Sequence, residues 1–264
     1  MFVEAIASEQ PRSRWFAIVP AALALALGSY GPIAQWADYH AFADSRAWLG
    51  IPNAANVLSN LPFAAVGAWG LWQLARLRRA GPGARADGAW RLFCIAVLCT
   101  AAGSALYHGS PDNQSLVTDR LPIAWACAAL LCGFLGERFD ARWTDASALA
   151  AALVMATLSV GWWWWTEQRT TGDLRAYLFV QVLPMILIPL ALWIRAEPAR
   201  GDMVRNLTWW LVLSLYAAAK GLEMADHWVF NATHGVSGHT LKHVFAAGAA
   251  GVLVAAVVRR DQLR

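Results

Sequence analysis

Long apolar runs separated by short polar stretches fill the chain of 264 residues. A helix needs about 20 mostly apolar residues to cross a bilayer, whose hydrocarbon offers backbone groups no other partner. Eight runs approach that length and predict eight membrane spans: Trp15–Tyr30, Asn53–Ala75, Trp90–His108, Asp119–Gly136, Thr144–Trp163, Leu174–Ile194, Asn206–Glu223 and His239–Val258. No long linker and no convincing repeat divides them. We therefore expect an all-α, polytopic transmembrane bundle that forms a single domain over residues 1–264.

The composition agrees with this expectation. Hydrophobic residues make up 58% of the chain and charged residues only 14%, against roughly 45–50% and 25% in soluble domains. These values exclude a soluble enzyme, a disordered protein and a small disulfide-stabilised domain. The four cysteines all lie within apolar runs, so we expect buried thiols that pack as small hydrophobic side chains: Cys94, Cys99, Cys127 and Cys132.

The distribution of basic residues predicts an orientation. Fifteen arginines fall on one set of alternating ends and loops, and four on the other: Arg46, Arg120, Arg169 and Arg175. Because cytoplasmic loops carry the excess of Lys and Arg, both termini should be cytoplasmic, as in a bacterial inner-membrane protein. The net charge of +4 is then a sign of bilayer orientation and not of nucleic-acid binding. Arg12 and Arg14 before an Ala/Leu run are also typical of a signal peptide, whose removal would leave seven spans.

Five polar residues are predicted to meet at the outer end of the bundle. The third span runs outward and brings Ser104 and His108 there, while the fourth begins there at Asp119 and the eighth at His239 and His243. Side chains four residues apart share one face of a helix. Ionisable groups in a bilayer are costly and mark functional sites. The active site is therefore expected toward the outer leaflet.

These residue types suit a catalytic zinc site, which takes three protein ligands and keeps one position for water. His108, His239 and His243 would be the ligands. Asp119 could accept a proton from the water that zinc activates, and Ser104 could donate a hydrogen bond to a developing oxyanion. The alternative for these side chains is interhelical hydrogen bonding with no metal.

The other candidate residues have simpler explanations. We expect His40 and His234 to be solvated in outer loops. His227 shares a turn with Glu223 and Asp226, which could form a second metal site, salt bridges with Lys220 or Lys242, or a second shell around the ligand histidines. Trp162–Trp165 are typical of an aromatic belt at the membrane interface, with a substrate-stacking platform as the alternative.

Four short motifs resemble the alkaline ceramidase family, within a wider group of seven-helix membrane hydrolases that includes the adiponectin-receptor-like proteins. They are SNLPF at Ser59–Phe63, SALYH at Ser104–His108, DRLP at Asp119–Pro122 and SGHTLKH at Ser237–His243. The likeness runs from about Asp38 to the end of the chain. It implies a seven-helix hydrolase core, to which Trp15–Tyr30 adds one span.

The resemblance also implies an activity. A ceramidase-like member would be a zinc-dependent hydrolase of a linear amide C–N bond, cleaving ceramide or a related N-acyl membrane lipid to a sphingoid base and a fatty acid. His108, His239 and His243 would then hold zinc, with Asp119 and Ser104 catalytic. No obligate protein partner is implied.

Eukaryotic members of that family carry an acidic calcium-binding stretch before the Ser-Asn-Leu motif. Here only Asp44 and Asn53 fall at plausible ligand positions, and calcium prefers six to eight oxygens. The sequence therefore supports Ca²⁺ binding only weakly.

Two other classes compete with a hydrolase. A seven-helix lipid receptor would use the zinc structurally, which favours a closed site of four protein ligands. A proton-coupled transporter would use Asp119 and Glu223 as a relay, but transporters usually show an internal repeat and a polar site at the midplane.

Overall fold

A computed structural model of the chain describes residues 15–80, 88–169, 172–194 and 204–262. Within these ranges the secondary structure is helical, apart from an isolated bridge between Trp48 and Ile51. The helices are α2 (Trp15–Tyr30), α3 (Ala54–Leu58), α4 (Leu61–Ala80), α5 (Gly88–Gly109), α6 (Leu116–Arg138), the short 3₁₀ helix η1 (Ala141–Thr144), α7 (Ala146–Glu167), α8 (Arg175–Trp193), α9 (Asn206–Met224), α10 (Asp226–Thr233) and α11 (Gly238–Gln262). The all-α prediction is confirmed.

Each predicted run contains a helix, but the second run is interrupted. Within Asn53–Ala75, α3 ends at Leu58 and α4 begins at Leu61. Pro62 explains a new start, because proline lacks a backbone N–H and is tolerated only in the first turn of a helix. The interruption turns Ser59 and Asn60 into a corner between two helices.

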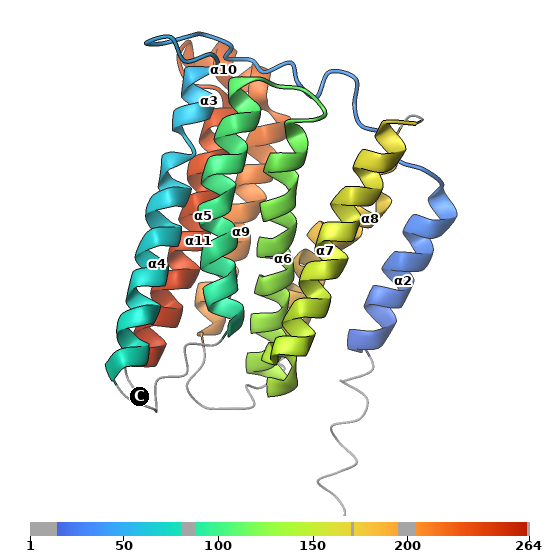
Figure 1. Ribbon diagram of the computed structural model, residues 1–264, viewed down its shortest axis with the longest axis vertical. Helices are drawn as coiled ribbons and strands as arrows, with labels where there is room; N and C mark the ends of the chain where they lie inside the picture. The colour runs from blue at the N-terminus through green and yellow to red at the C-terminus, as the bar shows by residue number, and fades with distance from the viewer. Residues whose placement is uncertain (1–14, 81–87, 170–171, 195–203, 263–264) are drawn as a thin grey trace, which may run out of the picture.

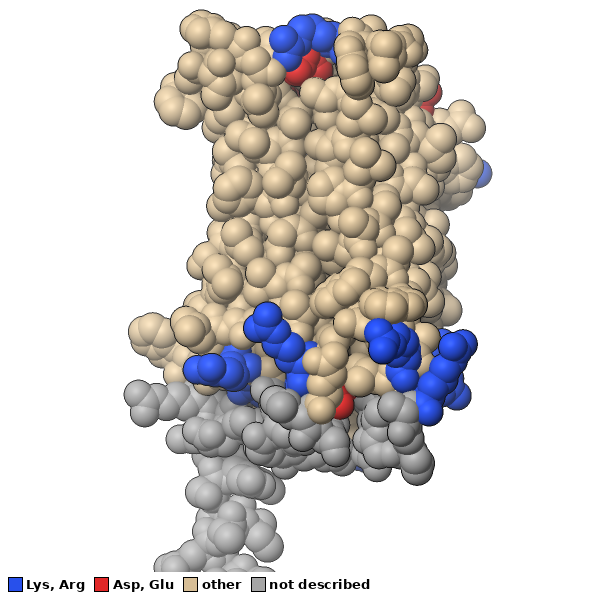
Figure 2. Space-filling view, turned by 90° about the vertical axis from the view of Figure 1, so that its left-hand side faces the viewer, with Lys and Arg blue, Asp and Glu red and all other residues tan. Residues whose placement is uncertain are grey.

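Five helices are long and apolar enough to cross a membrane, namely α5, α6, α7, α8 and α11. The other predicted spans coincide with α2, which has only 16 residues, with α3 and α4, and with α9. Figure 2 shows a face on which a broad uncharged zone separates the two ends. These features indicate a membrane protein, whereas the count of eight spans stays a prediction.

The helices form one bundle, with α2 at its edge (Figure 1). Helix α5 packs between α4 and α6, and α11 packs on both α4 and α9. Helices α7 and α8 cover the far side of α6, and α2 lies against α8. The main apolar core includes Trp90, Phe134, Trp209 and Leu253. Of the cysteines, Cys94, Cys127 and Cys132 are buried as expected, but Cys99 is exposed on the surface of α5, so that prediction was wrong.

The two ends of the bundle differ in chemistry. Arginines of the last turns of α4, α6 and α11 gather at one end: Arg78, Arg79, Arg138, Arg259 and Arg260. Figure 2 shows basic side chains clustered at that end of the face it draws. At the opposite end α5 finishes and α6 and α11 begin; we call it the histidine end because it holds His108, His239 and His243. These five arginines, which were predicted to share one side of a membrane, therefore share one end of the molecule. Six others of that set lie outside the described residues: Arg12, Arg14, Arg85, Arg195, Arg200 and Arg264.

A close approach of α5 and α6 sets the spacing at the histidine end. A Cβ atom added to Gly103 would lie only 1.9 Å from the backbone oxygen of Thr118. The Thr118 hydroxyl donates a hydrogen bond of 2.9 Å to the Gly103 oxygen. Gly103 thus lets the backbone before Ser104 touch the backbone before Asp119.

Gly103→Ala should therefore push α5 away from α6 and lower the free energy of unfolding by about 1–3 kcal/mol. Thermal unfolding in detergent, followed by circular dichroism, measures this effect. Gly161→Ala in α7 is the matched control, because nothing lies within 4 Å of its added Cβ. Equal melting temperatures for the two variants would contradict the close-packing argument.

Candidate metal centre

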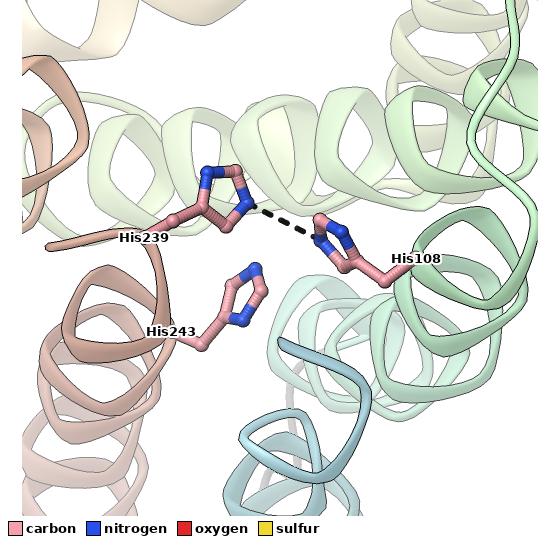
Figure 3. A group of neighbouring side chains, drawn as sticks. All are labelled: His108, His239 and His243. Atoms are coloured by element: carbon pink, nitrogen blue, oxygen red, sulfur yellow. Dashed lines mark hydrogen bonds between the residues drawn. The ribbon is translucent and has the colours of Figure 1, made fainter. Parts of the chain in front are cut away.

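Three buried imidazole rings meet at the histidine end (Figure 3). His108 lies in the last turn of α5, and His239 and His243 lie in the first two turns of α11. One ligand nitrogen from each ring lies within 4.8 Å of the others. The Nε2 atoms of His108 and His239 are 3.3 Å apart. The predicted meeting of helices far apart in the sequence is therefore observed for the histidines.

This geometry fits a metal ion of the zinc type. Zn–N bonds of 2.0–2.1 Å in a tetrahedron place two ligand nitrogens about 3.3 Å apart, which matches the observed separation of the Nε2 atoms. Neutral imidazole is a common ligand of zinc and of several other transition metals. The cluster could hold such an ion, and the geometry does not by itself select the element.

Ser59 orients one of the three rings. Its Oγ lies 2.7 Å from Nδ1 of His243 and donates its own proton to the backbone oxygen of Asn56 at 3.0 Å. Because that proton is used, Oγ accepts a hydrogen bond from Nδ1–H. The Nε2 atom of His243 is then the unprotonated one and is available to a metal, an arrangement typical of ligand histidines.

The other two ligands are held through their backbones. The Oδ1 atom of Asp226 accepts a hydrogen bond of 2.7 Å from the His239 N–H, and its Oδ2 accepts one of 2.9 Å from Ala43. The Nδ2 atom of Asn53 donates to the His108 oxygen at 2.8 Å. The sequence suggested that Asp226 could support the ligand histidines. It does support His239, but it bonds to the backbone N–H of that residue and not to its imidazole ring.

The two candidate calcium ligands have other partners. Asn53 holds the backbone of His108, as above. Asp44 is buried and forms two hydrogen bonds of 2.7 Å with the guanidinium of Arg46. These bonds hold the pKa of the Asp44 carboxyl below its ordinary value. A carboxylate that is already neutralised by an arginine is a poor start for a calcium site.

Ser104 and Asp119 share a cavity with one of the histidines. Both side chains are buried. They line a cavity of about 200 Å³ together with His243. Away from these polar groups its walls are mostly apolar side chains of α5, α6, α8, α9 and α11. Asp119 lies outside the group of possible metal ligands.

Glu223 is part of an ion cluster. Its two carboxylate oxygens accept hydrogen bonds from the ammonium groups of Lys220 and Lys242. This is the salt-bridge alternative named above for this turn. His227 is exposed, and its Nε2 atom lies 3.3 Å from the Ala41 oxygen. In the described ranges the sole group that could hold a metal is that of His108, His239 and His243, so the structure provides no second metal site at this turn.

Two local predictions, for His40 and for Trp162–Trp165, need correction or qualification. His40 is partly buried, and its ring nitrogens bond to Tyr107 and Asn113 at 2.9 Å each, whereas we expected it to be solvated. His234 is exposed, as expected. Within Trp162–Trp165 three rings are exposed, but Trp163 is fully buried against Arg120. A membrane belt therefore does not explain all four tryptophans.

No protein-family model, no curated protein and no solved structure matches this chain. The resemblance to ceramidases thus rests on the four short motifs. The metal centre rests on the geometry of three side chains.

Purified protein should contain about one zinc ion per chain. The double variant His239→Ala/His243→Ala should lose it, because a single imidazole remains. Elemental analysis by mass spectrometry measures the content, and His234→Ala, at an exposed position near the same end, is the control. Stoichiometric zinc in the double variant would end the assignment.

Ser59→Ala should keep the ligands but weaken zinc affinity by about 10- to 100-fold.

Proposed function

We propose that the protein is a zinc-dependent intramembrane amidase that hydrolyses ceramide or a related N-acyl lipid. One observation carries this proposal: His243 of the buried histidine cluster lines an apolar cavity that also contains Asp119 and Ser104. A metal ligand, a potential base and a hydroxyl donor thus face the same enclosed space. The four motifs shared with ceramidases favour the same reaction.

The cavity suits a lipid chain. On α9 its wall extends from Trp209 to Glu223, a helical rise of about 21 Å. Phe93, Ile188 and Leu253 line its deeper part. Burial of an acyl chain there removes apolar surface from water, and the amide group is left near the polar end. An amide substrate is thereby oriented along the bundle.

The polar residues have complementary roles in hydrolysis. When bound, a zinc ion supplies a Lewis acid and makes water nucleophilic near neutral pH. Asp119 accepts a proton from the attacking water while the oxygen of that water forms a bond to the amide carbon. Asp119 then returns this proton to the nitrogen as the C–N bond breaks, which yields an amine and a carboxylic acid. Ser104 turns its hydroxyl toward the carbonyl oxygen, where negative charge develops.

The proposed orientation places both termini in the cytoplasm and the histidine end at the outer leaflet of a bacterial inner membrane, since the arginines gather at the opposite end. Reporter fusions after Pro111, at the histidine end, and after Trp143, in η1, test it. The first should report an external location and the second a cytoplasmic one. The reverse pattern would contradict the orientation.

Asp119→Asn should lower turnover by about 10²- to 10⁴-fold, because the amide keeps the size of the side chain but cannot act as a base. Zinc content should stay unchanged, since the histidines are intact. Single-turnover hydrolysis of a labelled N-acyl lipid and elemental analysis on the same sample measure both effects. Ser104→Ala should act in the same way, by roughly tenfold to a thousandfold.

Two outcomes would count against the proposal. Wild-type hydrolysis by fully zinc-loaded Asp119→Asn protein would exclude the base role. A lipid receptor with a structural zinc predicts no turnover by the wild type, together with loss of zinc in the Asp119 variant if that residue supports a ligand.

A further inference from the structure

Residues 33–46 belong to the connection between α2 and α3 and cross the histidine end of the bundle (Figure 1). We call this segment the strap. The centre of the Phe42 ring in the strap lies 4.8 Å from that of the His108 ring and 4.7 Å from that of the His239 ring. Such separations are typical of aromatic rings packed in contact. The strap therefore covers two of the three candidate metal ligands.

The cavity meets the cluster at the remaining histidine. Of the three histidines, only His243 is among the described residues that line the cavity. His108 is fully buried, and His239 and His243 are only 6% and 4% exposed. The histidine cluster thus lies between the strap on one side and the apolar cavity on the other, with almost no surface of its own in contact with solvent.

Ring packing takes the place of a hydrogen bond at His108. A ligand histidine usually donates its second ring N–H to a carbonyl, a carboxylate or water, which fixes the orientation of the ring. His243 has a partner of this kind in Ser59, whereas the Nδ1 atom of His108 is buried with no hydrogen-bond partner in the described part of the chain. The His108 ring instead packs against Phe42 and Tyr107, with 4.8 Å between ring centres in both cases. Phe42 therefore helps to hold a ring that lacks polar support.

Hydrogen bonds anchor the strap on both sides of Phe42. Before it, the ring nitrogens of His40 form two bonds of 2.9 Å, one to Tyr107 of α5 and one to the loop that follows α5. After it, the N–H of Ala43 donates a bond of 2.9 Å to Asp226, whose carboxylate also holds the first ligand of α11. The strap is thus tied to the segments that carry the ligands. Phe42 leaves the cluster only when these bonds break.

We propose that Phe42 seals the metal centre on its aqueous side, so that a bound ion exchanges with solvent only when the strap lifts. This inference rests on the metal centre and not on the amidase reaction. An apolar shell around a metal site controls the access of water to it. Loss of the ion requires water or another ligand to replace an imidazole, and the Phe42 ring blocks the approach to two of the three. Phe42 thus slows metal exchange without being a ligand.

Release of zinc to a chelator tests the seal. Zinc-loaded protein in detergent is mixed with excess EDTA, and the zinc that stays on the protein is followed over time by elemental analysis. Phe42→Ala should lose zinc at least about tenfold faster than the wild type, because water and chelator then reach the covered rings. Phe42→Leu should release zinc more slowly than Phe42→Ala, since leucine refills much of the apolar volume. Thermal unfolding of each variant establishes that the protein stays folded during the assay.

Trp36→Ala is the matched control, because Trp36 is an aromatic residue of the same strap but is 70% exposed. Its release rate should equal that of the wild type. His40→Ala lifts the strap without changing the Phe42 ring, since it removes both hydrogen bonds before that residue. It should also speed release, and it decides the question if Phe42→Ala does not fold.

Four results would overturn the inference. The first is release at the wild-type rate by folded Phe42→Ala protein, or by His40→Ala where Phe42→Ala does not fold. The second is an equal acceleration by Trp36→Ala, and the third is equal release by the Phe42→Ala and Phe42→Leu variants. The fourth is wild-type protein that binds no zinc, which would overturn the metal centre as well.

The assay contains no lipid, so its outcome is separate from that of the proposed function. Faster release from Phe42→Ala supports the seal even if the wild type cleaves no lipid. Unchanged release rates in a protein that does cleave N-acyl lipids overturn the seal alone.

Discussion

The cost of burying polar groups in an apolar bundle is the constraint on which the rest of this structure depends. A polar group taken from water without a partner costs several kcal/mol in a hydrocarbon-like environment. At the histidine end paired contacts meet part of this cost, since Ser59 bonds to His243, Asn53 to the backbone of His108 and Asp226 to that of His239. Three imidazoles are thereby held so close that a single ion can be shared among them. The polar site and the apolar bundle are compatible only because these contacts are in place.

The position of the histidines in the fold also lowers the cost of burying them. The histidines lie where helices end or begin, and there the chain supplies loop segments with free N–H groups and side chains that can act as partners. Below them the cavity wall becomes apolar, from Val97 and Ile123 down to Leu253. The gradient from charged to apolar matches an amphipathic ligand better than it matches a conduction path, which would need polar groups along its whole length. It favours lipid chemistry over transport.

The positions of the helices and of the histidine cluster could be predicted from the sequence, for a clear physical reason. Apolar runs set helix positions, and alternating topology brings His108 and His239 to one end from opposite directions. The supporting contacts were not predictable in this way. The bond from Ser59 depends on the corner made at Pro62, and the bond from Asp226 depends on where the short α10 leaves it. The burial of Trp163 and the two bonds of His40 arise from the packing of distant segments. Such contacts carry no local periodicity.

The order in which the ribosome makes these segments has a consequence for assembly. The Asp226 carboxylate binds Ala43, from an early segment, and His239, from the last helix described, and so closes a loop of nearly two hundred residues with two hydrogen bonds. His108 is inserted long before His239 and His243 are synthesised. During translation the early helices therefore enter the bilayer before the histidine cluster is complete. Capture of a metal ion by this cluster would then be a late step of biogenesis, possible only once the whole bundle has been assembled.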